Sequence, residues 1–235
     1  DDSVYVSTPS VLGKFPKKIT PNYFSKGLNP FVFDSIRADV LYFDKTDSVL
    51  YAGNKTGLHL YKDRKKIQHR YASFNGLSFT DIDKDGQGIF IATTLGDGVF
   101  FFNKDTVLNL NEKSGLTDNM CTSLFMQNDS TVWVSTLNGL NRILYNYSDG
   151  EFTGIKIRNF YRNDGLPSNY INDIYIYGDS VWLATNIGLA VFNEKDLPSY
   201  SYSPKMVIEA FKANDVYRPV FSSARINLDR NSNNI

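Results

Sequence analysis

A short motif recurs five times along this chain and constrains its fold more than any other feature. Three mainly apolar residues are followed by two small or polar residues, in Val4–Thr8, Leu50–Asn54, Phe90–Thr94, Val132–Thr136 and Val181–Thr185. Aligned on Thr8, Gly53, Thr93, Thr136 and Thr185, the copies lie 45, 40, 43 and 49 residues apart. A regular step of this length corresponds to one supersecondary unit, so the chain is a repeat protein.

Each motif lies within the same series of strands and turns. A turn with glycine leads from it to a further apolar run, which predicts an antiparallel hairpin. These runs are Thr56–Tyr61, Asp97–Phe101, Asn138–Ile143 and Ile187–Phe192, and the strands expected before the motif are Val40–Phe43, Phe79–Ile82, Cys121–Met126 and Ile171–Ile176. A fourth run follows at Ile67–Tyr71 and Phe152–Ile157. Four strands per repeat predict an all-β chain of β-propeller blades, about five over residues 1–195.

The two ends of the sequence suggest a fragment of a larger protein. The first motif begins almost at residue 1 without a preceding strand, so the first blade is incomplete and further blades are expected upstream. The repeats end near residue 196, and residues 196–204, with Pro198 and Pro204, are interpreted as a linker. A new alternating strand starts at Lys205–Ala213, so residues 205–235 are expected to begin a second domain.

Composition excludes several functional classes. The 25 basic and 25 acidic residues cancel, which argues against a nucleic-acid partner and against a basic membrane-binding patch. No apolar run is long enough to span a membrane, so membrane attachment is expected only through segments outside this chain. Cys121 is the single cysteine and is expected to be a buried apolar residue. Trp133 and Trp182 occupy equivalent strand positions, and we expect both to be buried between blades.

The last two repeats carry a family resemblance. Asp164–Ile174 followed by Asp179–Leu189, and Ser114–Asn119 followed by Val132–Leu140, resemble the two-component regulator propeller repeat, with a weaker copy at Asn75–Leu77 and Phe90–Thr93. The first copy departs from the pattern after Thr8, where Pro9 to Gly13 replace the usual turn. The region from Pro204 resembles the start of the triple-tyrosine domain, an immunoglobulin-like β-sandwich.

The resemblance implies a function that the spacing alone does not. Members of this family form the extracytoplasmic, periplasmic sensor portion of bacterial histidine kinases and hybrid two-component systems, and many respond to glycans. A glycan or other small-molecule ligand and a homodimer of the receptor are therefore the implied partners. The resemblance implies a non-catalytic sensor; a propeller hydrolase or lyase acting on a carbohydrate or lactone, or a passive interaction scaffold, remain alternatives.

No catalytic set is assembled in the sequence, and we expect no metal and no cofactor. Asp81-x-Asp83-x-Asp85-Gly86 resembles the start of a calcium loop, but Ala92 stands where that loop needs a bidentate glutamate. His59 and His69 are the only histidines and are interpreted as surface residues. Converging carboxylates of a glycoside hydrolase are the remaining possibility, and Asp81, Asp118 and Asp173 are its candidates.

Ligand binding is predicted at the loops that surround a propeller axis on one face. Amides beside an aromatic ring can recognise hydroxyl-rich ligands, although asparagine is also favoured in tight turns for its own local hydrogen bonds. The predicted ligand-binding residues are Asn54, Lys55, Asn75, Asn119, Asn138, Asn169, Tyr170 and Asn186.

Overall fold

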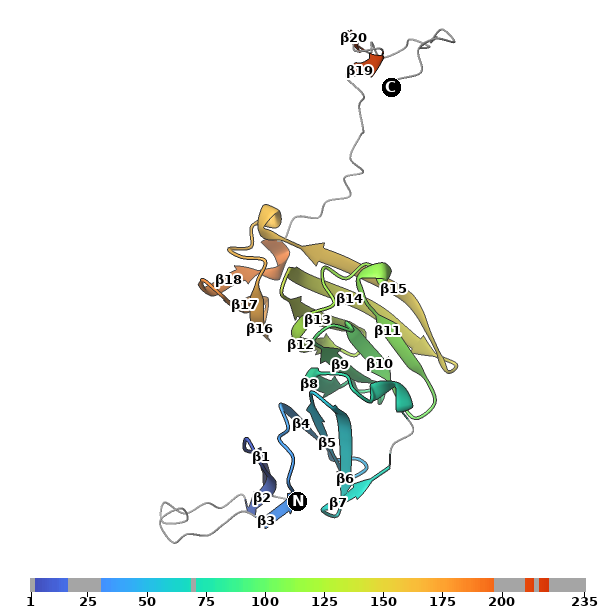
Figure 1. The fold of residues 1–235 in the computed structure, drawn as a ribbon, viewed down its shortest axis with the longest axis vertical. Helices are drawn as coiled ribbons and strands as arrows, with labels where there is room; N and C mark the ends of the chain where they lie inside the picture. Colours follow the sequence, from blue (N-terminus) through green and yellow to red (C-terminus); the bar gives the residue numbers. More distant parts are fainter. Residues whose placement is uncertain (1–2, 17–30, 69–70, 197–209, 214–215, 220–235) are drawn as a thin grey trace. The chain divides into compact units, whose positions relative to one another are not determined.

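The computed structural model describes residues 3–16, 31–68, 71–196, 210–213 and 216–219 (Figure 1). The chain forms two compact units, Asp1–Leu197 and Pro198–Ile235. The described residues contain β-strands and four short 3₁₀ turns, and no α-helix.

The first unit is a series of antiparallel sheets in which each strand pairs with its neighbours in the sequence. Three sheets have four strands, and the first and last have three among the described residues. The first sheet contains β1 (Ser3–Ser7), β2 (Leu12–Pro16) and β3 (Phe31–Asp34). The second contains β4 (Val40–Asp44), β5 (Val49–Asn54), β6 (Gly57–Lys62) and β7 (Lys65–Ile67). The predicted four-stranded propeller blades are confirmed.

The remaining sheets of this unit repeat the pattern. The third sheet contains β8 (Phe79–Lys84), β9 (Phe90–Thr94), β10 (Val99–Phe102) and β11 (Val107–Leu110), and the fourth contains β12 (Cys121–Asn128), β13 (Thr131–Thr136), β14 (Gly139–Ser148) and β15 (Glu151–Phe160). The fifth contains β16 (Ile171–Tyr177), β17 (Ser180–Thr185) and β18 (Gly188–Asn193). The 3₁₀ turns are η1 (Ala72–Phe74), η2 (Glu112–Ser114), η3 (Arg162–Asp164) and η4 (Glu194–Asp196).

Glycine is required at the turn between the second and third strands of a sheet. Gly57 and Gly139 both have φ of 135°, a conformation that L side chains rarely adopt. A Cβ atom at Gly57 would lie 2.8 Å from the carbonyl oxygen of Phe74, and one at Gly139 would lie 2.8 Å from that of Phe160. The hairpin therefore fits closely against the loop that leads to the next sheet.

The core lies between successive sheets, and each sheet has two distinct faces. We call the face with Tyr51, Ile91 or Trp133 the forward face, because it packs against the sheet that follows in the sequence, and the opposite one the rear face. One buried cluster joins the forward face of β4–β7 to the rear face of β8–β11. A second joins the forward face of β8–β11 to the rear face of β12–β15, and a third joins the forward face of β12–β15 to the rear face of β16–β18. Strand alternation explains both faces, because successive side chains point to opposite sides.

The prediction that Trp182 is buried between blades is wrong. Trp133 has no exposed surface, whereas the equivalent Trp182 is 39% exposed. Trp133 lies on a forward face that β16–β18 cover, and its ring stacks on Phe160 with the centroids 5.7 Å apart. Trp182 lies on the forward face of β16–β18 itself, and no sheet of the described residues covers that face.

The second unit contains an antiparallel hairpin of β19 (Ala210–Ala213) and β20 (Val216–Pro219). The strand expected from residue 205 is observed from residue 210, and residues 205–209 lie outside the described part of the chain. The linker at 196–204 lies outside it as well, apart from Asp196, and the immunoglobulin-like domain remains a prediction.

Candidate functional site

The predicted ligand-binding residues all lie on one edge of the sheets, which we call the loop rim. It comprises the turns between second and third strands (54–56, 95–98, 137–138 and 186–187) and the loops that lead into the next sheet (35–39, 71–78, 111–120 and 161–170). These segments share an edge because the second strand ends, and the next first strand begins, at the same end of the sheet. Their local contacts decide which side chains are available to a ligand.

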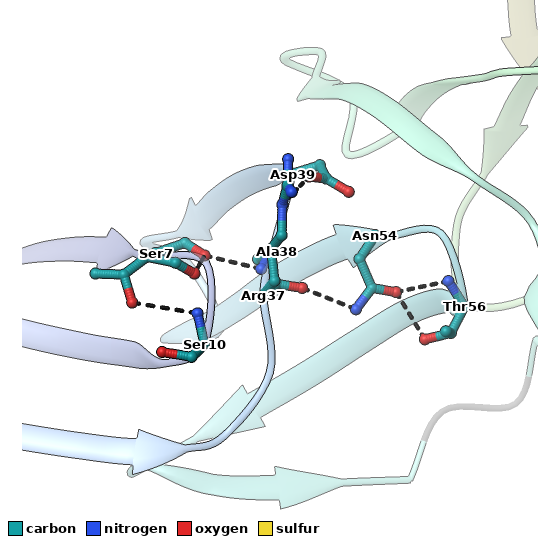
Figure 2. Close-up of polar contacts among 8 residues, drawn as sticks. Ser7, Ser10, Arg37, Ala38, Asp39, Asn54 and Thr56 are labelled. Carbon is teal, nitrogen blue, oxygen red and sulfur yellow. Dashed lines mark hydrogen bonds and ion pairs between the residues drawn. The ribbon is translucent and has the colours of Figure 1, made fainter.

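Asn54 joins two of these segments through its side chain, as Figure 2 shows. Its Nδ2 donates to the carbonyl oxygen of Arg37 at 2.9 Å, and its Oδ1 accepts from the Thr56 backbone N at 2.8 Å and from Thr56 Oγ1 at 2.7 Å. Nearby, the Ala38 backbone N donates to Ser7 Oγ at 2.8 Å. Asn54 is also buried, so it holds the turn in place and is not free to bind.

A shallow depression of about 330 Å³ lies beside Asn54 and is lined by Ile36, Arg37, Asp39, Asn54, Lys55 and Thr56. Arg37 Nε lies 2.7 Å from Asp39 Oδ1, which orients the guanidinium group at its edge. Lys55 is exposed at the tip of the turn. Charged donors, a hydroxyl group and an apolar side chain are thus combined in one concave surface, as in small-ligand sites.

Asn119 and Asn169 close the loops in which they lie. Asn119 Oδ1 accepts from the backbone N of Glu112 at 2.8 Å, and Asn169 Oδ1 accepts from that of Arg162 at 2.6 Å. Both bonds span seven residues and satisfy a free N–H at the start of a 3₁₀ turn. These two amides therefore have an architectural role in equivalent loops.

The residues predicted in the last two turns are connected with one another. Asn169 Nδ2 donates to Asn138 Oδ1 at 3.3 Å, and Ser168 Oγ donates to Asn186 Oδ1 at 2.7 Å. The backbone of Tyr170 is fixed by a bond from its N to Ser168 Oγ, but its side chain is 41% exposed. This part of the loop rim offers a supported aromatic ring beside amide groups.

Asn75 lies in the loop that packs on the first glycine turn. The adjacent Gly76 N donates to the Thr56 carbonyl oxygen at 2.9 Å, and Asn75 itself is exposed. The structure thus groups Asn54, Lys55 and Asn75 at one place and Asn138, Asn169, Tyr170 and Asn186 at another, with Asn119 closing its own loop. Whether these residues bind a ligand remains a prediction.

Two of the three candidate acids converge between the first strands of adjacent sheets. Ser123 Oγ lies 2.9 Å from Asp81 Oδ2 and 2.7 Å from Asp173 Oδ1. The Leu124 backbone N also donates to Asp81 Oδ2 at 3.0 Å. Asp118 is not part of this group, because its Oδ1 accepts from the Met120 backbone N at 2.8 Å within its own loop.

The surroundings of Asp81 shift the pKa of its carboxyl group. Burial raises the pKa of Asp81 above its ordinary value, hydrogen bonds from Leu124, Ser123 and Ile82 oppose that rise, and the charge of Asp173 adds to it. Ser123 has a single hydroxyl proton and can donate to only one carboxylate at a time. Ser123 therefore donates either to Asp81 or to Asp173.

Other chemistry considered from the sequence takes a structural form. Among the residues that the structure describes, no group of three or more His, Cys, Asp or Glu side chains is placed to hold a metal ion. Asp85, from the calcium-like motif, accepts from the backbone N of Ile89 and from Tyr145 Oη. Cys121 is fully buried as expected, and burial, with the Asp118 charge, raises the pKa of its thiol to about 12. His59 lies on β6, and His69 lies outside the described residues.

Sequence reasoning missed Arg37, Asp39 and Ser123. Arg37 and Asp39 precede a first strand at the place where later repeats have Asp118 and Asn119, but the first repeats match the family pattern poorly there. Alignment of the first strands could have found Ser123, which stands between Asp81 and Asp173 in the repeat order.

Comparisons with known proteins show the fold. No family model and no curated protein matches the sequence. YCF48 bound to D1 peptide matches with a TM-score of 0.54, 14% identity and coverage of 86% of this chain and 63% of that one. A chain of the Mitotic Checkpoint Complex matches with a TM-score of 0.55 and 12% identity, covering 82% of this chain and 61% of that one.

The chain is also similar to an extracellular domain ascribed to a hybrid two-component system, BT3049 of B. thetaiotaomicron. The TM-score is 0.47 at 17% identity, with 83% of this chain covered. This chain spans about a third, 34%, of the length of that domain. No helix among the described residues is long and apolar enough to cross a membrane.

Proposed function

We propose that this chain is the ligand-sensing propeller of a periplasmic, two-component type receptor, and that it binds a glycan or a related small ligand without turning it over. The observation that carries the proposal is the depression on the loop rim, where Arg37, Lys55 and Thr56 line one concave surface. The regulator-type repeats at Ser114–Asn119 and Asp164–Ile174 support the receptor class.

The contacts of the candidate acids support a non-catalytic reading. The carboxylate of Asp81 accepts from Ser123, Leu124 and Ile82, which are groups of the protein itself. A general acid or nucleophile must instead reach the substrate within hydrogen-bond distance. We therefore assign Asp81 to the junction between sheets.

Signal transfer is proposed to run from the propeller through residues 196–204 to the domain that follows. A ligand can shift this junction only by its difference in affinity for two states of the receptor. In the full-length receptor, a Gly/Ser replacement of residues 196–204 should retain ligand binding and abolish the output. Retained signalling would contradict this route.

Binding is tested on the whole chain with a panel of neutral and acidic oligosaccharides, by thermal shift followed by isothermal titration calorimetry. For an oligosaccharide that binds in this screen, Lys55→Ala should weaken the affinity about tenfold, because the complex loses one hydrogen bond to a charged group. Lys45→Ala is the matched control, because Lys45 is also exposed but lies at the opposite end of β5. Equal affinities of the two variants would contradict the proposed site.

The same panel separates the alternative functions. Release of a cleaved sugar or an opened lactone by the isolated chain would replace the sensor proposal with a hydrolase or lyase. Failure of every oligosaccharide to bind, together with binding of a protein, would favour the interaction scaffold.

A further inference from the structure

We propose that the outer edge of β15 binds an extended acidic segment of a partner protein, which adds to the sheet as a further strand. The inference concerns a protein partner and is independent of the ligand proposed for the loop rim. Strand addition of this kind takes its affinity from backbone hydrogen bonds and its selectivity from alternate side chains.

β15 is the longest outer strand among the described residues. It has ten residues, whereas the outer strands β7 and β11 have three and four. It pairs with β14 and ends its sheet (Figure 1). The sheets β8–β11 and β16–β18 pack on the two faces of β12–β15, so the edge, and not a face, is the surface left for a partner. Backbone N–H and C=O groups along such an edge can pair with another chain.

Side chains alternate along this edge between a basic row and an apolar row. Arg158 lies on the forward face, because it is in register with Arg142 and through it with Trp133, and Lys156 follows on the same side. Ile157 lies on the rear face and packs against the buried cluster there. An added strand would therefore meet positive charge on one side and apolar surface on the other.

The basic row lacks an acidic counterpart. Across the sheet, Arg158 faces Arg142, and Lys156 faces Leu144. Arg142 pairs with Glu194 at 3.0 Å, whereas neither Arg158 nor Lys156 forms an ion pair with any residue that the structure describes. Two positive charges at alternate positions of the edge are thus left for a partner.

The charge and its placement identify the chemistry of that partner. Residues 152–163 include Lys156, Arg158 and Arg162 and no acidic residue, although the whole chain balances 25 basic with 25 acidic residues. The Arg158 guanidinium group lies 4.7 Å from the centre of the Phe160 ring, which orients it before any partner binds.

Cross-strand charges then decide which strand the edge accepts. Opposite charges facing each other on adjacent strands stabilise a sheet, and like charges destabilise it. The edge therefore selects a strand with acidic residues two positions apart and an apolar residue between them. It disfavours the β15 of a second copy, because the two basic rows would face each other.

Fluorescence anisotropy with the whole chain tests this proposal. The probe is a labelled eight-residue peptide of alternating Glu and Val, which should bind saturably, whereas the matching peptide of alternating Lys and Val should not. Arg158→Glu and Lys156→Glu should each weaken binding of the Glu peptide about tenfold, because an attraction becomes a repulsion. Lys66→Glu is the matched control: it makes an equal charge change at an exposed position of the outer strand β7, and it should bind like the wild type. Circular dichroism melts verify that each variant is folded.

Two further peptides separate strand addition from charge attraction alone. One has the same composition with its glutamates consecutive, and the other has D-residues at its two central positions, which keeps the charge but breaks the extended strand. Both should bind about tenfold more weakly than the alternating peptide. Equal affinity of either peptide would overturn the proposal. So would equal losses in Arg158→Glu and Lys66→Glu, or no saturable binding of the alternating peptide up to about 1 mM.

Discussion

Trp133 and Trp182 occupy the same position in two consecutive repeats, yet one is fully buried and the other is 39% exposed. Their strands, turns and cross-strand neighbours correspond: Trp133 pairs with Phe125 and Arg142, and Trp182 pairs with Tyr175 and Val191. The repeat determines the strand and the direction of the side chain. Burial depends on the neighbouring sheet.

The surroundings of Trp133 show what the neighbouring sheet contributes. Trp133 Nε1 donates to Gln127 Oε1 at 3.0 Å, and Gln127 Nε2 donates to Glu194 Oε2 at 2.6 Å. Glu194, which follows the last strand of the next sheet, also pairs with Arg142 at 3.0 Å. At the turns, Gly57 and Gly139 fit against the next loop, whereas a Cβ atom at Gly188 would have nothing within 4 Å.

The largest expected effect concerns the two tryptophans. Trp133→Ala should lower the free energy of unfolding by about 3 to 5 kcal/mol, because it leaves a cavity in a packed interface. Trp182→Ala should cost less than about 1 kcal/mol, because much of its ring already contacts water. Urea denaturation of both variants measures the difference. Equal shifts of the denaturation midpoint would show that the two tryptophans are equally buried.

The second prediction concerns an ion pair between the first strands of two inner sheets. Lys84 Nζ lies 2.8 Å from Asp44 Oδ2, and the Asp44 side chain is only 3% exposed. Burial alone would raise the pKa of Asp44, but hydrogen bonds from Lys84 and Thr46 and the Lys84 charge hold it below its ordinary value. Lys84→Met should cost about 2 kcal/mol at neutral pH, less than for a fully buried pair, because Lys84 is partly exposed.

The pH dependence of this pair has a definite sign. A carboxyl group with a lowered folded pKa stabilises the fold above its unfolded pKa, and that contribution is lost as the pH falls through the folded value. The stability difference between wild type and Lys84→Met should therefore disappear in acid. If the stability difference between the two proteins persisted unchanged under acidic conditions, Lys84 would stabilise the fold through packing and not through its charge.

A smaller effect is expected for a buried hydroxyl group. Tyr145 Oη donates to Asp85 Oδ2 at 2.9 Å, and both residues are buried. Tyr145→Phe should cost about 1 to 2 kcal/mol, since it leaves a buried carboxylate oxygen without its donor. Tyr177→Phe, in the last sheet and 75% exposed, is the control and should leave the thermal midpoint unchanged. A shift in the control as large as that of Tyr145→Phe would remove the distinction between the sheets.

The smallest effect is expected for Asp81. Its pKa is raised in the folded state, so its ionisation opposes folding, and the fold gains stability as the pH falls through that pKa. Asp81→Asn should cost about 1 kcal/mol at neutral pH, because the amide oxygen can still accept from Ser123 and Leu124, whereas the NH2 group that replaces the other oxygen cannot accept from the Ile82 backbone N. It should also remove the gain at lower pH. Thermal midpoints over a pH series measure the cost of the substitution and the pH dependence of stability. If the midpoint of the variant changes with pH as steeply as that of the wild type, Asp81 is not the source of the pH dependence.

The sequence predicted what is local and missed what depends on neighbours. The glycine turns at Gly57 and Gly139 and the strand order follow from residue types and spacing. The exposure of Trp182 does not follow from the sequence, because the same apolar pattern is compatible with a covered or an uncovered sheet face. Asp81 and Asp173 were candidates, but Ser123, which joins them, lies in a third sheet and has no local signature. Arg37 and Asp39 line the depression from a loop whose sequence does not repeat.

Acrylamide quenching of tryptophan fluorescence tests the central claim most directly, namely that burial in this repeat depends on the neighbouring sheet. Trp133→Phe leaves Trp182 as the single reporter, and Trp182→Phe leaves Trp133. Trp182 should emit at longer wavelength and be strongly quenched, whereas Trp133 should emit at shorter wavelength and be protected. Equal protection of the two tryptophans would contradict the account.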